Sequence, residues 1–164
     1  MPDHSRIVVI NTTPLIALAA VDQLQLLASL YPDGILVPDD VWREYHAGSS
    51  GHTDVALDAI PALRRTHLAD PRHAQLLSDL DPGEAAVIAL GQERNADLLI
   101  IDERLGRRHA MRLGFKVTGT LGVLLRAKQT GLIPNLETMI RDLRRHGLYL
   151  GDTVVQAVLR AAKE

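Results

Sequence analysis

The sequence predicts one α/β domain built on a parallel β-sheet that is covered by helices. Short apolar runs alternate along the chain with longer segments of helical pattern, which is typical of strand–helix–strand crossovers. The hydrophobic share is 46% but the aromatic share is only 3%, so the core must consist mainly of aliphatic side chains, as in buried parallel strands. The length of 164 residues fits a single domain, which we place over residues 1–164.

Apolar runs predict strands at residues 7–10, 35–37, 98–101 and 115–117. Capping and turn residues predict helices over 15–30 with a break near 21–22, then over 38–46, 54–64, 72–80, 82–94, 103–113, 120–131, 134–146 and 151–163. Residues 47–53, rich in glycine and serine, are predicted to form a loop. The clearest helix start has Asp81 as the N-cap, Pro82 at the first helical position and Glu84 at the third.

Composition and charge exclude several classes of protein. The chain contains no cysteine, which excludes disulfides and thiolate metal sites and fits a reducing compartment. Its net charge of −2 and pI near 6.4 differ from the strongly basic profile of an architectural DNA-binding protein. No secretory signal pattern is visible, and no apolar run approaches the roughly 18 residues that a membrane span needs. We therefore expect a cytoplasmic protein with no membrane partner.

Four acidic or amide side chains are expected to meet at one edge of the sheet. Asn11 and Asp102 directly follow apolar strands, so both lie at the carboxyl edge of a parallel sheet. Glu44 and Glu84 lie on helices that should start at that edge. Gathered carboxylates repel one another unless a cation lies between them, and oxygen ligands suit Mg²⁺ or Mn²⁺. Because such ions activate water and stabilise a phosphodiester under attack, the set suggests metal-dependent phosphodiester hydrolysis.

A structural role is the alternative for each of these four residues. Glu84 could simply complete a capping box at its helix start, and Asp102 could cap the helix that follows it. Glu44 could pair with a neighbouring arginine or lie on a solvated helix face. Asn11 could be an ordinary strand-end turn former. The functional interpretation therefore rests on the whole set and on its order along the chain.

Two arginine clusters could contact a nucleic acid. Arg104, Arg107 and Arg108 share one helix face next to Asp102, where they could hold the phosphates of an RNA. The second cluster comprises Arg141, Arg144 and Arg145. A solvated charged face is the alternative for both clusters.

A turn at residues 118–122 follows a predicted strand and opens a helix. The hydroxyls of Thr118 and Thr120 and nearby backbone N–H groups could bind a phosphate or a water on a metal. Ordinary helix capping is the alternative. The turn is not a P-loop, because no Gly-Lys-Ser/Thr follows it.

An ordered set of motifs over nearly the whole chain resembles one family. The motifs comprise residues 10–16, Val37-Pro38 with Val41 and Glu44, residues 83–85, residues 99–103 with Arg107-Arg108, residues 114–122, and then Leu125, Ala127-Lys128 and residues 131–134. Together they resemble PIN-domain proteins, and within them a prokaryotic subfamily related to VapC-type toxin ribonucleases.

The resemblance implies a three-layer sandwich with a parallel central sheet of about five strands flanked by helices. It implies an Mg²⁺- or Mn²⁺-dependent endoribonuclease, often the toxin of a toxin–antitoxin pair and often a homodimer. The family's acidic quartet maps to Asn11, Glu44, Glu84 and Asp102. Thr12 would be a supporting hydroxyl near the metal, and Glu103 takes the place of a second acid often found there.

The chain departs from the family pattern at the first position of the quartet, where aspartate is usual and this chain has Asn11. An amide oxygen can ligate a cation, but it brings no negative charge. A slow enzyme, an enzyme that prefers Mn²⁺, and a catalytically impaired nucleic-acid-binding or regulatory module are therefore all open. A flavodoxin-like phosphoacceptor domain is disfavoured, because no acidic pair precedes Asn11.

Two protein partners are also implied by the resemblance. A small antitoxin would occupy an apolar groove lined by the early helices, over residues 15–30, close to the acidic cleft. Homodimerisation could use the apolar residues of the C-terminal helices, although these could serve the core instead. Those residues are Leu143, Leu148, Leu150, Val154, Val155 and Val158.

Overall fold

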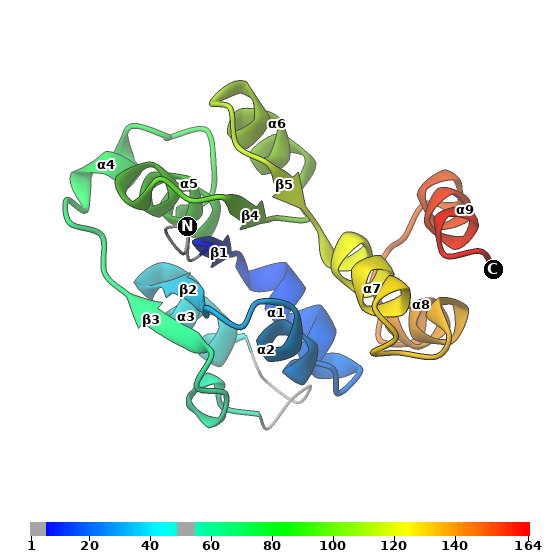
Figure 1. The fold of residues 1–164 in the computed structure, drawn as a ribbon. Coiled ribbons are helices and arrows are strands. Elements are labelled where there is room, and N and C mark those ends of the chain that lie inside the picture. The colour runs from blue at the N-terminus through cyan, green and yellow to red at the C-terminus, as the bar shows by residue number, and fades with distance from the viewer. Residues whose placement is uncertain (1–5, 49–54) are drawn as a thin grey trace, which may run out of the picture.

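The computed structural model describes residues 6–48 and 55–164 and shows a sheet of five parallel strands (Figure 1). The strands are β1 (Val8–Ile10), β2 (Ile35–Pro38), β3 (Leu63–Thr66), β4 (Leu98–Ile100) and β5 (Val117–Thr118). Their order across the sheet is β3-β2-β1-β4-β5. The predicted α/β class with a parallel central sheet is confirmed.

Helices flank the sheet. They are α1 (Thr12–Ala20), α2 (Gln25–Leu30), α3 (Asp39–Ala47), α4 (Arg72–Gln75), α5 (Pro82–Arg94), α6 (Arg104–Arg112), α7 (Thr120–Gln129), α8 (Leu136–Arg145) and α9 (Asp152–Ala161), with a 3₁₀ turn, η1 (Leu57–Ala59). Figure 1 shows α5 and α6 on one side of the sheet and α1 and α2 on the other. Helices α7, α8 and α9 contact one another and gather beyond β5.

The centre of the sheet is aliphatic and closed to solvent. Val9 of β1 pairs with Leu36 on one side and Leu99 on the other. Val9 and Leu99 are fully buried, as expected for parallel strands that helices cover on both faces. Burying each such side chain contributes about 1.5–3 kcal/mol, so the sheet centre is a rigid base for the loops at its edge.

The structure corrects three of the sequence predictions. The helix predicted over 54–64 is wrong, because this region contains η1 and the start of β3, and Pro61 interrupts any helix there. The helix predicted over 72–80 is only the single turn α4, none of whose residues is buried. The strand predicted at 115–117 begins two residues later than expected, as β5 (Val117–Thr118). Residues 49–53 of the predicted loop lie outside the described part of the chain.

The break predicted near 21–22 is confirmed, since α1 and α2 are separate helices. Asp22 has φ of 56° there, and the residues around it join α1 to α2. The leucines of α1 and α2 face the core, where Leu15, Leu18 and Leu27 are fully buried. On the surface of α1, where the groove for an antitoxin was predicted, the structure has a hollow of about 160 Å³ between α1 and the end of α8.

The apolar residues of the C-terminal helices mostly serve the core. Leu143 and Val155 are buried, and Leu148, Leu150 and Val158 pack against the core. Val154 differs, with 54% of its surface exposed.

The chain path creates a crevice at the carboxyl ends of two neighbouring strands. It proceeds from β1 outward to β2 and β3, then returns to the opposite side of β1 to form β4 and β5. In open parallel sheets, ligands bind where the strand order reverses in this way. The residues that follow β1 and β4 are therefore the first place to look for a site. In the described ranges, no helix is both long enough and apolar enough to traverse a lipid bilayer.

Candidate functional site

Asn11 stands in the crevice directly after β1. Its backbone N–H donates to the carbonyl oxygen of Ile100 on β4 at 2.9 Å, which ties the two strand ends together. The residue is only 4% exposed, and its side chain makes no capping bond to α1. Its Oδ1 and the hydroxyl of Thr12 are buried without a hydrogen-bond partner among the described residues. A buried polar atom left unpaired costs about 1–3 kcal/mol, so this pair suggests a ligand rather than a simple turn.

Glu44 of α3 reaches the same place, over the first turn of α5. A Cβ added to Gly83 would stand 2.7 Å from Glu44 Oε2 and 3.3 Å from Asn11 Oδ1. A side chain at this position would push the Glu44 carboxylate away from its place beside Asn11. Arg43 pairs with Asp40 at 2.6 Å, so the alternative of an ion pair between Glu44 and its neighbour is not observed.

Glu84 is the buried acid of the group, with 6% of its surface exposed. Its backbone N–H donates to Asp81 Oδ1 at 2.8 Å, which confirms Asp81 as the N-cap of α5. Its own carboxylate extends toward α6, where Oε2 lies 3.1 Å from the place a Cβ on Gly106 would take. Burial, followed by the nearby carboxyls of Asp81, Glu103 and Glu44, raises the pKa of Glu84 to about 7. Burial and the neighbouring carboxylates thus make it costly to ionise every carboxyl group of the site at once.

Asp102 lies just beyond β4 and is directed to the start of α7. Its Oδ1 accepts from the backbone N–H of Thr120 at 2.7 Å, and its Oδ2 accepts from the Thr120 hydroxyl at 2.6 Å. The helix that Asp102 caps is therefore α7, and not the one that directly follows it. Arg107 is beside it, because a Cβ on Gly119 would stand 2.5 Å from Asp102 Oδ1 and 2.9 Å from Arg107 Nη1.

The other residues singled out from the sequence lie around these four. Glu103 is exposed and close enough to influence the Glu84 carboxyl. Thr118 ends β5, with its hydroxyl against Gly122, and Thr120 is engaged by Asp102. Arg104 and Arg108 are exposed on α6.

A groove of about 900 Å³ runs from Asp102 and Glu103 along α6. One wall carries the α6 arginines, and the opposite wall comes from residues 148–151 and α9. Asp102 and Thr13 line it at the acidic end. The sequence interpretation missed the second wall, because it considered these apolar residues only for the core or a dimer contact.

The donor set fits a hard divalent cation in its chemistry. The side chains of Asn11, Glu44, Glu84 and Asp102 all offer oxygen, and oxygen ligands suit Mg²⁺ or Mn²⁺. Within residues 6–48 and 55–164, however, no three His, Cys, Asp or Glu side chains form a ready metal cluster. The first member of the set is the amide Asn11, and the Asp102 carboxylate is directed to Thr120.

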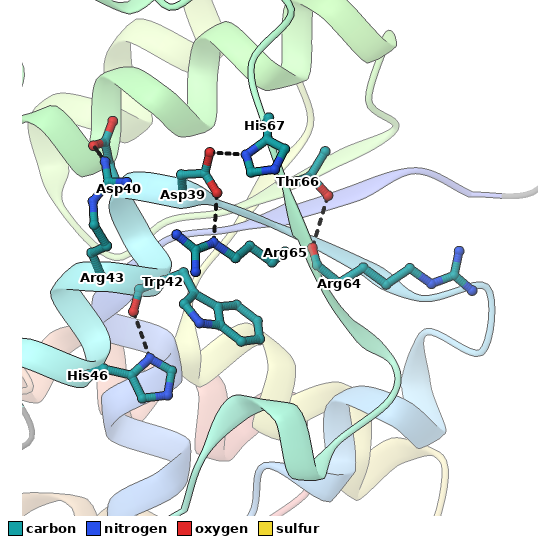
Figure 2. A network of polar contacts seen from close by, with 9 residues as sticks. All are labelled: Asp39, Asp40, Trp42, Arg43, His46, Arg64, Arg65, Thr66 and His67. Atoms are coloured by element: carbon teal, nitrogen blue, oxygen red, sulfur yellow. Dashed lines mark hydrogen bonds and ion pairs between the residues drawn. The ribbon is translucent and has the colours of Figure 1, made fainter.

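A second polar cluster, at the ends of β2 and β3, is a structural link (Figure 2). Arg65 Nε donates to Asp39 Oδ1 at 2.8 Å, His67 contacts the other carboxylate oxygen, and the Arg65 guanidinium lies 5.9 Å from the Trp42 ring centroid. Burial acts to raise the pKa of Asp39, but the hydrogen bonds from His67 and Arg65 outweigh it and hold the pKa below its usual value. These contacts fasten α3 to the edge strand.

Comparison with known families supplies the deciding observation, because a family model described as a PIN domain matches residues 7–164. The chain belongs to the PIN-domain family. PIN domains are a nuclease family whose members generally use divalent metal ions and act on RNA or DNA. No curated protein matches the chain.

Proposed function

We propose that this PIN-domain protein is a metal-dependent endoribonuclease in which Asn11, Glu44, Glu84 and Asp102 hold Mg²⁺ or Mn²⁺. The observation that carries the proposal is the buried, unpartnered Oδ1 of Asn11, which faces Glu44 Oε2 across Gly83. An acidic cluster alone would be weak support. A buried amide oxygen that lacks a protein partner and points into that cluster is a second observation, and a bound cation or its water would satisfy it.

A bound divalent ion would supply positive charge that activates a water and stabilises the attacked phosphate. The chain's own groups do the remaining work. With a pKa raised to about 7, Glu84 can hold or release a proton near neutral pH, and the cation would shift it to the ionised form. Arg107, fixed by a bond from Nη1 to the carbonyl oxygen of Ile101 at 3.1 Å, is positioned to hold a phosphate at the groove entrance.

The deciding experiment is cleavage of a labelled single-stranded RNA with Mn²⁺, Mg²⁺ or EDTA. Glu44→Gln is the best variant, because Glu44 is exposed and its loss should not unfold the protein. Asp102→Asn should also abolish cleavage, but it weakens the Thr120 contacts as well. Glu137→Gln, which changes an exposed side chain of α8, is the matched control and should leave cleavage unchanged.

Metal-dependent cleavage that is lost in Glu44→Gln and kept in Glu137→Gln supports the proposal. Calorimetry with Mn²⁺ gives a second measurement, in which Glu44→Gln should weaken binding. Cleavage that persists in EDTA, or in Glu44→Gln, contradicts it.

The amide of Asn11 favours one other candidate, a PIN module that binds RNA without cutting it. Such a module would bind RNA with steep salt dependence and show no cleavage by the native chain. Gain of cleavage in Asn11→Asp would then support it, whereas activity in the native chain would exclude it.

The toxin role, the antitoxin partner, homodimerisation and a cytoplasmic location are further proposals supported only by the family resemblance and composition. Co-purification from the native host tests for the antitoxin. Light scattering after size-exclusion chromatography tests for the homodimer.

A further inference from the structure

One aromatic side chain stands in the groove beside the candidate site. Tyr149 is 91% exposed, whereas the other tyrosines, Tyr31 and Tyr45, are 4% and 1% exposed. Trp42 and Phe115, which complete the set of aromatic residues, are partly buried. Exposure of a large apolar ring costs solvation free energy, so a single one located in a groove suggests contact with a ligand.

The exposure of Tyr149 is built into its backbone. The N–H of Leu148 donates to the carbonyl oxygen of Leu143 at 3.1 Å, and Arg144 Nη2 donates to the carbonyl oxygen of Leu150 at 3.0 Å. Leu148 and Leu150 both pack against the core. With its two neighbours anchored inward, Tyr149 is held outward on a fixed support. Such preorganisation lowers the entropy cost of binding a partner.

The opposite wall of the groove is basic. Arg104, Arg107 and Arg108 line it from α6, and Val154 lines the side that carries Tyr149. A groove with arginines on one wall and an aromatic ring on the other suits a ligand with an anionic backbone and flat apolar rings. Unpaired nucleotides have this composition, and in a duplex the base faces are already stacked and hidden.

We propose that Tyr149 is a base-stacking residue that makes this groove a binding path for single-stranded RNA. The phosphates lie against the α6 arginines, one base stacks on the Tyr149 ring, and the strand leads to Asp102 at the acidic end. The substrate class rests on the proposed ribonuclease function. The choice of RNA over a protein is favoured because Asp102 and Glu103 of the candidate site line one end of the groove.

The experiment measures binding and not cleavage. Native protein, Tyr149→Ala and Tyr149→Phe are titrated by fluorescence anisotropy in EDTA at about 50 mM salt, where phosphate contacts are strong. Two labelled probes are used: a short single-stranded RNA, and an oligomer of equal length with abasic spacers in place of the nucleosides. Leu76→Ala, which removes an 82%-exposed apolar side chain outside the groove, is the control.

Tyr149→Ala is expected to weaken RNA binding about tenfold, which corresponds to one lost base stack, while Tyr149→Phe stays close to the native protein. All variants should bind the abasic probe equally. Leu76→Ala should match the native protein on both probes. Thermal unfolding should be unchanged in Tyr149→Ala, because the lost side chain is exposed.

Three results would overturn the inference: unchanged RNA affinity in Tyr149→Ala, equal losses on both probes, or no RNA binding by the native protein. The last result would leave the groove to a protein partner. The outcome is separable from the nuclease proposal. Tyr149-dependent binding without metal-dependent cleavage keeps the inference and removes the nuclease, whereas cleavage without Tyr149 dependence does the reverse.

Discussion

Replacement of Asn11 by aspartate tests how the site uses charge. Asn11 Oδ1 and Glu44 Oε2 both lie within 3.3 Å of one point beside Gly83. Charges on both, at most about 6 Å apart, would repel by about 3 kcal/mol at an effective dielectric constant near 20. Solvent around the exposed Glu44 reduces this to about 1–2 kcal/mol. Asn11→Asp is therefore expected to lower the free energy of unfolding by about 1–2 kcal/mol without metal.

Saturating Mn²⁺ should reverse the order of stability, because the added carboxylate then faces a cation. We expect Mn²⁺ affinity to rise by about tenfold, which corresponds to about 1.4 kcal/mol. Urea unfolding followed by circular dichroism, in EDTA and in Mn²⁺, measures both effects. Asn135→Asp is the control, since aspartate also caps a helix and α8 should keep its stability. Equal unfolding free energies in EDTA, together with unchanged Mn²⁺ affinity, would refute the reasoning.

Three further predictions follow from single contacts. In EDTA, the raised pKa of Glu84 means that the folded state binds more protons than the unfolded state between about pH 4.5 and 7. Stability should therefore fall by up to about 3 kcal/mol as pH rises through this range, and Glu84→Gln should flatten the dependence seen in urea unfolding. Thr120→Val removes the 2.6 Å hydroxyl bond to Asp102 and should lower the melting temperature, at a cost of about 1–2 kcal/mol. Gly83→Ala places a methyl group 2.7 Å from Glu44 Oε2, so calorimetry should show Mn²⁺ binding weakened about tenfold while circular dichroism stays native.

Much of the fold could be predicted because its central strands are local apolar runs. The strands near residues 7–10, 35–37 and 98–101 carry that signal, and the parallel order follows from the helices between them. Strand β3 was missed because it lies at the sheet edge, where Arg64 and Arg65 face solvent and no apolar run forms. An edge strand is defined by its neighbour, which a local pattern does not show.

The site was only partly accessible from sequence for a similar reason. Strand continuity was enough to place Asn11 and Asp102 at one edge. The hydrogen bonds between Asp102 and Thr120 join residues that are 18 positions apart in the sequence, so no local pattern predicts them. Tyr149 gave no signal either, because a single aromatic between two leucines is equally typical of a buried segment.

The two bonds between Asp102 and Thr120 give the site a natural spectroscopic reporter. The Thr120 amide proton is bound by a side chain of the acidic crevice, not by its own helix. Any ligand that draws the Asp102 carboxylate toward itself must lengthen that bond, which changes the Thr120 amide shift in a nitrogen–proton NMR spectrum and speeds its hydrogen exchange. Occupancy of the crevice can thus be followed in solution without a substrate and without a single mutation.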